Sequence, residues 1–176
     1  MKLSSIRLSG ACAIAALCGV GAASAGGHAV LLPRSFVQNA TGACQPALPY
    51  YEGTIRKRPL AIQNEGDASA FVNCSLVGTE RSTGGLKDVQ VVVTNMSAAP
   101  QAVSCTLIGE VTDASMTFLP KTLIVPGNQS GSAHVLRWDT VDIGGTLLKT
   151  ANLSCNIPSG AGLGETWVQF DEYVGN

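Results

Sequence analysis

The stretch Phe71-Val-Asn-Cys-Ser-Leu-Val-Gly78 is the strongest structural signal in the chain, because it recurs. A second copy, Ala102-Val-Ser-Cys-Thr-Leu-Ile-Gly109, begins thirty-one residues later, and a shorter copy, Asn152-Leu-Ser-Cys-Asn-Ile157, lies near the end. In each copy a cysteine lies in the middle of an alternation of apolar and polar residues. Such alternation is typical of a β-strand with one buried face. It predicts that Cys74 and its apolar neighbours point into the core.

Working outward from these copies, the chain shows further short strand signals separated by glycine and proline. Asp88–Asn95 is the most β-branched run, and we expect it to form a central strand. Pro126-Gly127-Asn128 predicts a turn in which the glycine takes a positive φ. No helical period appears after the first twenty-five residues. The pattern predicts an all-β fold, an antiparallel β-sandwich of the jelly-roll or immunoglobulin-like type.

The first twenty-five residues, Met1–Ala25, have the features of a secretory signal peptide. Lys2 and Arg7 provide a basic start, Ala11–Val20 is a short apolar run, and Ala23-Ser24-Ala25 is a small-residue cleavage site. The apolar run is too short for a transmembrane helix, and no later stretch is long enough for one. We therefore expect a secreted or periplasmic protein.

The expected mature chain has 151 residues, about one domain. Residues 26–43 are predicted to form an extended N-terminal leader, and residues 44–176 a single β-sandwich domain. The mature chain has nine lysines and arginines against twelve acidic residues, a net charge near −3. Nucleic acids and anionic membranes demand a basic surface, so neither is an expected partner.

Four cysteines remain after the signal peptide, namely Cys44, Cys74, Cys105 and Cys155. An even number in an exported chain indicates two disulfides, for which three connectivities exist. No pair has the C-x-x-C spacing of a redox or zinc site. We predict Cys44–Cys74, which would tie down the leader, and Cys105–Cys155, which would join two strands.

Cleavage after Ala25 would create the N-terminus Gly26-Gly27-His28. A free amine, two backbone amides and an imidazole can surround Cu(II) or Ni(II) with four nitrogens in a plane. These three residues resemble the amino-terminal copper- and nickel-binding motif of albumins and other exported proteins. The resemblance implies a metal site made by Gly26, Gly27 and His28, which cleavage after Ala23 would remove.

Catalytic constellations have weak support. His134 lies in the predicted strand Ser132–Trp138 with Asp139 and Asp142 downstream, but Gly127-Asn-Gln-Ser-Gly131 lacks the spacing of a nucleophile elbow. One histidine in the folded domain also excludes a three-histidine zinc site.

Acidic pairs do not change this conclusion. Asp171 and Glu172 are adjacent on the last predicted strand and point to opposite faces, and Glu165 precedes them. Asp139–Gly144 lacks the ligand pattern of a calcium-binding EF-hand. The chain is therefore predicted not to be an enzyme and to need no cofactor.

The large aromatic residues suggest a binding surface. Trp138 and Trp167, with Tyr50, Tyr51 and Tyr173, could form a platform for stacking a carbohydrate.

The run Arg56-Lys57-Arg58 has two interpretations: the charged edge of a sheet, or a contact for an anion or an acidic glycan.

As a whole, the chain resembles the small, uncharacterised exported β-sandwich proteins of Gram-negative bacteria, a resemblance of class that singles out no residues. We expect a non-enzymatic structural or binding protein of the cell envelope or the extracellular space, with an unknown protein or glycan as its partner. A fimbrial-type subunit is the alternative, since Thr166–Tyr173 is an alternating final strand suited to strand donation. A copper-handling protein and a carbohydrate-binding module remain further alternatives.

Overall fold

The computed structural model describes residues 30–77, 83–111, 115–129, 134–143, 148 and 150–174. In this part of the chain almost all regular structure is β-strand. The elements, in chain order, are β1 (Val30–Asn39), α1 (Ala40–Ala43), β2 (Cys44–Pro46), the 3-10 turn η1 (Pro49–Tyr51), β3 (Ile55–Arg58), β4 (Ala61–Asn64), β5 (Ala70–Ser75), β6 (Thr83–Asn95), β7 (Gln101–Val111), β8 (Ser115–Val125), β9 (Val135–Trp138), β10 (Thr150–Ile157) and β11 (Ala161–Val174). Among the described residues, no helix has the length and apolar character needed to span a bilayer.

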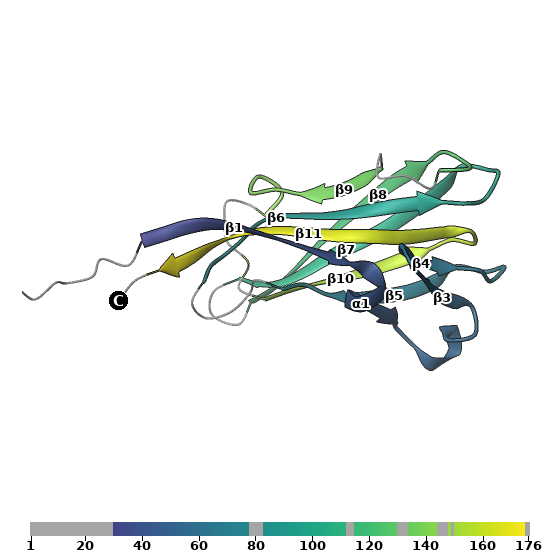
Figure 1. Cartoon of the computed structure of the whole chain (residues 1–176), viewed down its shortest axis with the longest axis horizontal. Helices are drawn as coiled ribbons and strands as arrows, with labels where there is room; N and C mark the ends of the chain where they lie inside the picture. Colours follow the sequence, from purple (N-terminus) through teal and green to yellow (C-terminus); the bar gives the residue numbers. More distant parts are fainter. Residues whose placement is uncertain are drawn as a thin grey trace, which may run out of the picture.

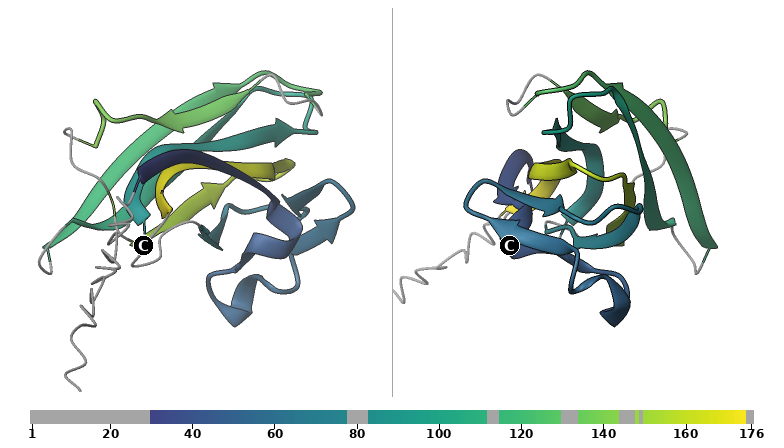
Figure 2. Two further views of the ribbon diagram at one scale, coloured as in Figure 1. Left: turned by 60° about the vertical axis from the view of Figure 1, so that its left-hand side comes forward. Right: turned by 90° about the vertical axis from the view of Figure 1, so that its right-hand side faces the viewer.

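The strands form two antiparallel sheets packed face to face (Figures 1 and 2). The six-stranded sheet has the order β3-β4-β11-β6-β9, and β1 also pairs with β11, on the edge that β4 occupies further along. The five-stranded sheet has the order β2-β5-β10-β7-β8. Strands β4 to β11 follow the chain path of a jelly roll. The predicted antiparallel sandwich is confirmed, in its jelly-roll form.

The predicted alternation is also confirmed. In β5, Ala70, Val72 and Cys74 are buried, whereas the residues between them are exposed. The core is made of the inward-facing apolar residues of both sheets.

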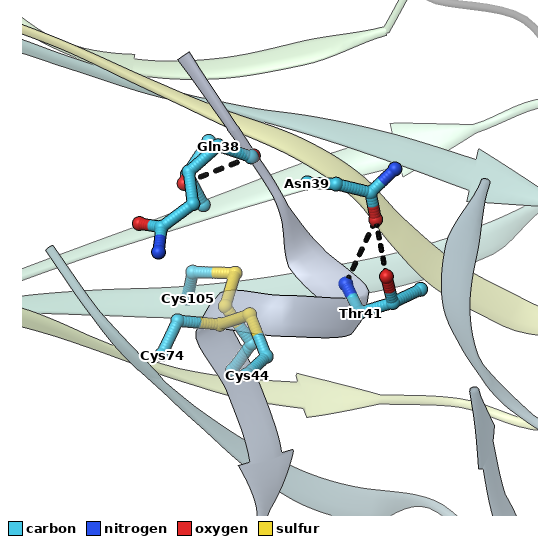
Figure 3. Close-up of a disulfide and its surroundings, with 8 residues drawn as sticks. Gln38, Asn39, Thr41, Cys44, Cys74 and Cys105 are labelled. Atoms are coloured by element: carbon cyan, nitrogen blue, oxygen red, sulfur yellow. Dashed lines mark hydrogen bonds between the residues drawn. A yellow bond between two sulfur atoms is a disulfide. The ribbon is translucent and has the colours of Figure 1, made fainter. Parts of the chain in front are cut away.

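Both predicted disulfides are present, Cys44–Cys74 and Cys105–Cys155 (Figure 3). Each joins two residues that lie directly opposite one another on neighbouring strands of the five-stranded sheet. The two bridges lie on the same face of this sheet, two residues apart, because Cys155 lies opposite Val72 and Cys74 lies opposite Leu153. One bridge connects β2 to β5 and the other connects β7 to β10, so four of the five strands of this sheet are covalently joined in two pairs.

The sequence repeat extends further than the cysteine strands. Asn64 and Asn95 lie thirty-one residues apart, as Cys74 and Cys105 do, and both asparagines are completely buried. Each ends a strand of the six-stranded sheet and holds the turn toward the five-stranded sheet. Their side-chain amides donate to Ala68 O and Ile157 O at 2.8 Å, and to Ala99 O at 2.8 Å and Val125 O at 3.0 Å. These buried amides therefore connect the two layers at one end of the sandwich.

The predicted turn at Pro126-Gly127-Asn128 is present, but the positive φ is not at the predicted residue. Asn128, and not Gly127, has the positive φ, 59°. Gly127 is required for another reason, because a Cβ there would lie 2.1 Å from Ala98 O. The glycine permits a close approach of two backbones, and the asparagine tolerates the left-handed conformation.

The expected central strand, Asp88–Asn95, belongs to β6 and lies inside the sheet between β11 and β9. The middle position is taken by β11, which runs the length of the molecule (Figure 1). The predicted leader contains β1 and the single turn α1. Asn39 caps this turn by accepting hydrogen bonds from Thr41 N and Oγ1, at 2.9 and 2.8 Å (Figure 3).

Candidate functional site

The outer face of the six-stranded sheet is the surface turned away from the five-stranded sheet. In the described part of the chain, this face carries aromatic, amide and charged side chains together. Along β11, Thr166 and Val168 point into the core and are buried, so Trp167 and Gln169 point outward and are half-buried. The position of β11 at the centre of the sheet places Trp167 away from the sheet margin formed by β9. This strand therefore presents the partly exposed ring of Trp167 on the outer face of the sheet.

Trp167 lies in a row that crosses four strands. The row runs from Val37 of β1 through Trp167 of β11 and Gln90 of β6 to Arg137 of β9. Residues directly opposite on neighbouring antiparallel strands lie about 5 Å apart at Cβ. The tryptophan therefore has an apolar neighbour on one side and hydrogen-bonding groups on the other.

Asp88 holds the polar side chains beside Trp167 in place. Its carboxylate accepts a hydrogen bond from Gln90 Nε2 at 3.0 Å and another from Arg137 Nε at 2.7 Å. The Asp88 side chain is only 5% exposed, whereas that of Arg137 is 58% exposed. The hydrogen bond to Asp88 raises the pKa of the Arg137 guanidinium above its ordinary value. A fixed anion thus orients the amide of Gln90, next to Trp167, and the exposed guanidinium of Arg137, one strand further along the row.

A shallow pocket of about 290 Å³ lies on the same sheet, at the end of β6. Two of its lining residues, Gln63 of β4 and Thr94 of β6, lie on one rung with Gly162 of β11. A Cβ at Gly162 would lie 3.0 Å from Thr94 Oγ1 and 2.8 Å from Ile62 O, so only glycine permits this packing. The pocket is mostly apolar and is lined by Arg58, Pro59, Leu60, Ala61, Gln63, Thr94 and Met96.

The pocket and Trp167 belong to one continuous surface. Thr94 and Gln90 are four residues apart on β6, which corresponds to about 13 Å along the strand. Between them Val92 lies opposite a bulge of β11 that contains Gly164 and Glu165. An extended ligand could therefore contact both the pocket and the tryptophan.

Of the aromatic residues predicted to form one platform, the structure brings only some to this face. Trp138 is fully buried, and its Nε1 donates to Leu119 O at 2.8 Å, so its predicted stacking role is wrong. Tyr50 and Tyr51 lie in η1, outside the sheet strands, with ring centroids 5.5 Å apart. Tyr173 is half-exposed and shares the outward side of β11 with Trp167, six residues further on.

The basic run Arg56-Lys57-Arg58 makes up most of β3, an edge strand of the six-stranded sheet. Arg58 donates to Glu65 Oε1 at 2.6 Å, and it also lines the pocket. A charged edge strand is thus observed, next to the surface that carries the pocket.

Of the residues considered for catalysis, the structure brings Asp139 and Asp142 together in the turn after β9, where Asp139 N donates to Asp142 Oδ2 at 3.0 Å. His134 is half-buried just before β9, and Asp142 lies in the turn after β9, where it pairs with Lys121 at 2.6 Å. Asp171 pairs with Lys87, and Glu172 pairs with Arg34 at 2.7 Å on the opposite side of the strand.

The expected metal site at Gly26, Gly27 and His28 lies outside the described residues. Within the described ranges, no group of three histidine, cysteine or acidic side chains is arranged to hold a metal ion.

The polar partners of Trp167 were not anticipated from the sequence, although a signal for them exists. Asp88 and Gln90 alternate with valines at the start of the β-branched run, which places both on the face opposite the buried valines. Arg137 was not identifiable in this way, because only strand order places β9 beside β6.

No protein-family model and no curated protein matches the chain. Among solved structures, it is similar to the structure of TmCBM61 in complex with beta-1,4-galactotriose, with 10% identity, coverage of 81% of this chain and 87% of that chain, and a TM-score of 0.25.

Proposed function

We propose that the chain is an exported, non-enzymatic binding protein that holds a glycan on the outer face of its six-stranded sheet. The observation that carries this proposal is the row of Trp167, Gln90 and Arg137, with Asp88 fixing its polar half. A sugar ring has an apolar face that packs on an aromatic ring and hydroxyl groups that bond to amides and guanidinium groups. The row offers both kinds of contact side by side.

The rest of the molecule suits such a role. Two buried disulfides are typical of proteins that fold in an oxidising compartment, so we place the protein in the periplasm or outside the cell. The pocket about 13 Å along the sheet from Trp167 supplies a second contact for an oligosaccharide. Longer oligosaccharides should therefore bind more tightly than single sugars.

The two tryptophans make a direct test available. Trp138 is sealed in the core, whereas Trp167 is partly exposed, so a fluorescence change on binding reports Trp167. The protein is titrated with a panel of soluble oligosaccharides of increasing length, and affinities are confirmed by calorimetry. We expect Trp167→Ala to raise the Kd of the tightest-binding oligosaccharide by about thirtyfold or more, because a central aromatic contact is lost.

The matched control is Phe71→Ala, which removes a half-exposed aromatic residue from the outer face of the other sheet. It should leave affinity unchanged. Arg137→Met keeps most of the apolar stem and removes the charge, and it should weaken binding less than Trp167→Ala does. Unchanged affinity in Trp167→Ala, or an equal loss in Phe71→Ala, would show that the ligand binds elsewhere.

A further inference from the structure

The first strand, β1, leaves its apolar side chains unburied. Val30, Leu31, Leu32, Phe36 and Val37 are between 40% and 55% exposed, on both faces of one ten-residue strand. Isolated apolar residues are common on protein surfaces, but a cluster on one strand commonly marks an interaction site. Val37 borders Trp167 in the proposed glycan row, but the exposure of the other four residues requires an explanation that the glycan site does not supply.

The exposure follows from the position of β1. It pairs with β11 along its whole length, and no other described strand pairs with its second edge (Figure 1). Its packing is against β11 and α1, and no described strand of the five-stranded sheet packs closely on it. An unpaired edge offers free backbone groups to another strand. Pro33, which cannot donate, is tolerated because it lies in an edge strand.

The order of residues in β1 selects the partner. Around Arg34 the strand has a two-fold pattern: Leu31 and Leu32 on one side, Phe36 and Val37 at the mirrored positions on the other. We propose that two copies of the chain pair through β1, antiparallel and edge to edge, with Arg34 on the two-fold axis. Leu32 then lies opposite Phe36 of the second copy, and Leu31 lies opposite Val37 of the second copy. A two-fold interface requires this kind of self-complementarity.

The charges are compatible with this register. The two Arg34 side chains meet at the axis, but each already pairs with Glu172 of its own chain at 2.7 Å. The four groups together are neutral. Pro33 lies opposite Ser35 of the second copy, so each half of the ladder lacks one donor and keeps the remaining backbone pairs. The result joins two six-stranded sheets into one continuous sheet across the dimer.

Sedimentation of the oxidised protein over a wide range of concentrations tests the association. We expect a monomer–dimer equilibrium that favours the dimer as concentration rises. Val37→Lys should weaken it by about tenfold or more, since lysine on an edge strand opposes pairing. The matched control is Ile124→Lys, which makes the same change at an exposed apolar residue of β8, the edge strand of the other sheet.

A cysteine at the axis tests the register. Arg34→Cys places two thiols opposite one another, about 5 Å apart at Cβ, and mild oxidation should give a covalent dimer. Leu31→Cys should not crosslink, because in this register the two copies of residue 31 are about 20 Å apart. A monomer at every concentration, long polymers in place of a dimer, or dimers that lose affinity in Ile124→Lys and not in Val37→Lys would each overturn the proposal. Efficient crosslinking by Leu31→Cys would do so as well.

Discussion

The five-stranded sheet carries both disulfides and an almost uncharged outer face. The six-stranded sheet is held without a disulfide in its described strands and carries a charged outer face, on which Trp167 lies. Among the outward-facing described residues of the five-stranded sheet, Glu110 alone is charged. A hollow of about 430 Å³ on this sheet is lined entirely by uncharged residues. On the six-stranded sheet, Trp167, Asp88, Arg137 and a largely apolar pocket share one surface.

This difference teaches how the sandwich divides its tasks. The two disulfides stabilise the five-stranded sheet, which serves as the base layer of the sandwich. The six-stranded sheet packs on this base layer through the core and through hydrogen bonds from the buried amides of Asn64 and Asn95. The six-stranded sheet can then give its outer residues to recognition. Changes to the two layers should therefore affect stability and binding to different degrees.

The largest expected effect comes from the base layer. Replacing Cys105 and Cys155 together by alanine should lower the free energy of unfolding by about 4 kcal/mol, the chain-entropy estimate for a loop closed by a bridge with a sequence separation of 50. Urea denaturation measures this loss. The glycan affinity of the fraction that stays folded should change little. A stability loss below about 1 kcal/mol would mean that the covalent base is unimportant.

A smaller effect is expected where the two layers meet. Asn95→Ala removes the amide that donates to Ala99 O and Val125 O and the carbonyl that accepts from Ser97, and it leaves buried partners unsatisfied. We expect the free energy of unfolding to fall by about 2 to 3 kcal/mol, measured by thermal and urea denaturation. Asn73→Ala, on the exposed face of β5, is the control and should stay within about 0.5 kcal/mol of the parent. Equal effects at the two positions would remove the special role of the buried turn asparagine.

The smallest effect concerns the open margin of the sandwich, where Lys121 of β8 bonds to Asp142 and to Arg137 O, both at 2.6 Å. The hydrogen bond from Lys121, followed by that from the Asp139 backbone, lowers the pKa of Asp142 below its ordinary value of 3.8. A depressed carboxyl pKa contributes stability that is present above 3.8 and is lost as the pH falls through the lower folded value.

The matching variant is Asp142→Asn, which should cost at most about 1 kcal/mol at neutral pH, because both side chains are about one-third exposed. Below the folded pKa the variant and the parent should become equally stable. Urea denaturation at neutral and acid pH measures the difference, and a gap that persists in acid would contradict the assigned cause.

Much of the fold could be predicted from particular residues. The alternation around Cys74 and Cys105 predicts which side of each strand is buried, because successive side chains of a strand point to opposite faces of the sheet. The two cysteine pairs were predicted correctly, although nothing in the alternation itself selects them from the three connectivities. Asn64-Glu-Gly-Asp67 has the residue types of a turn, and in the structure the Asn64 side chain holds this turn.

The candidate site depended on information that the chain order does not contain. Trp138 and Trp167 lie in similar alternating runs, yet one is sealed in the core and the other faces solvent. The local sequence pattern determines which face of a strand is buried. The long-range packing of the two sheets determines which strands become neighbours. Arg137 and Gln90 are separated by 46 intervening residues and meet only because β9 pairs with β6. Strand faces are therefore a property of the sequence pattern, and the row beside Trp167 is a property of the tertiary structure.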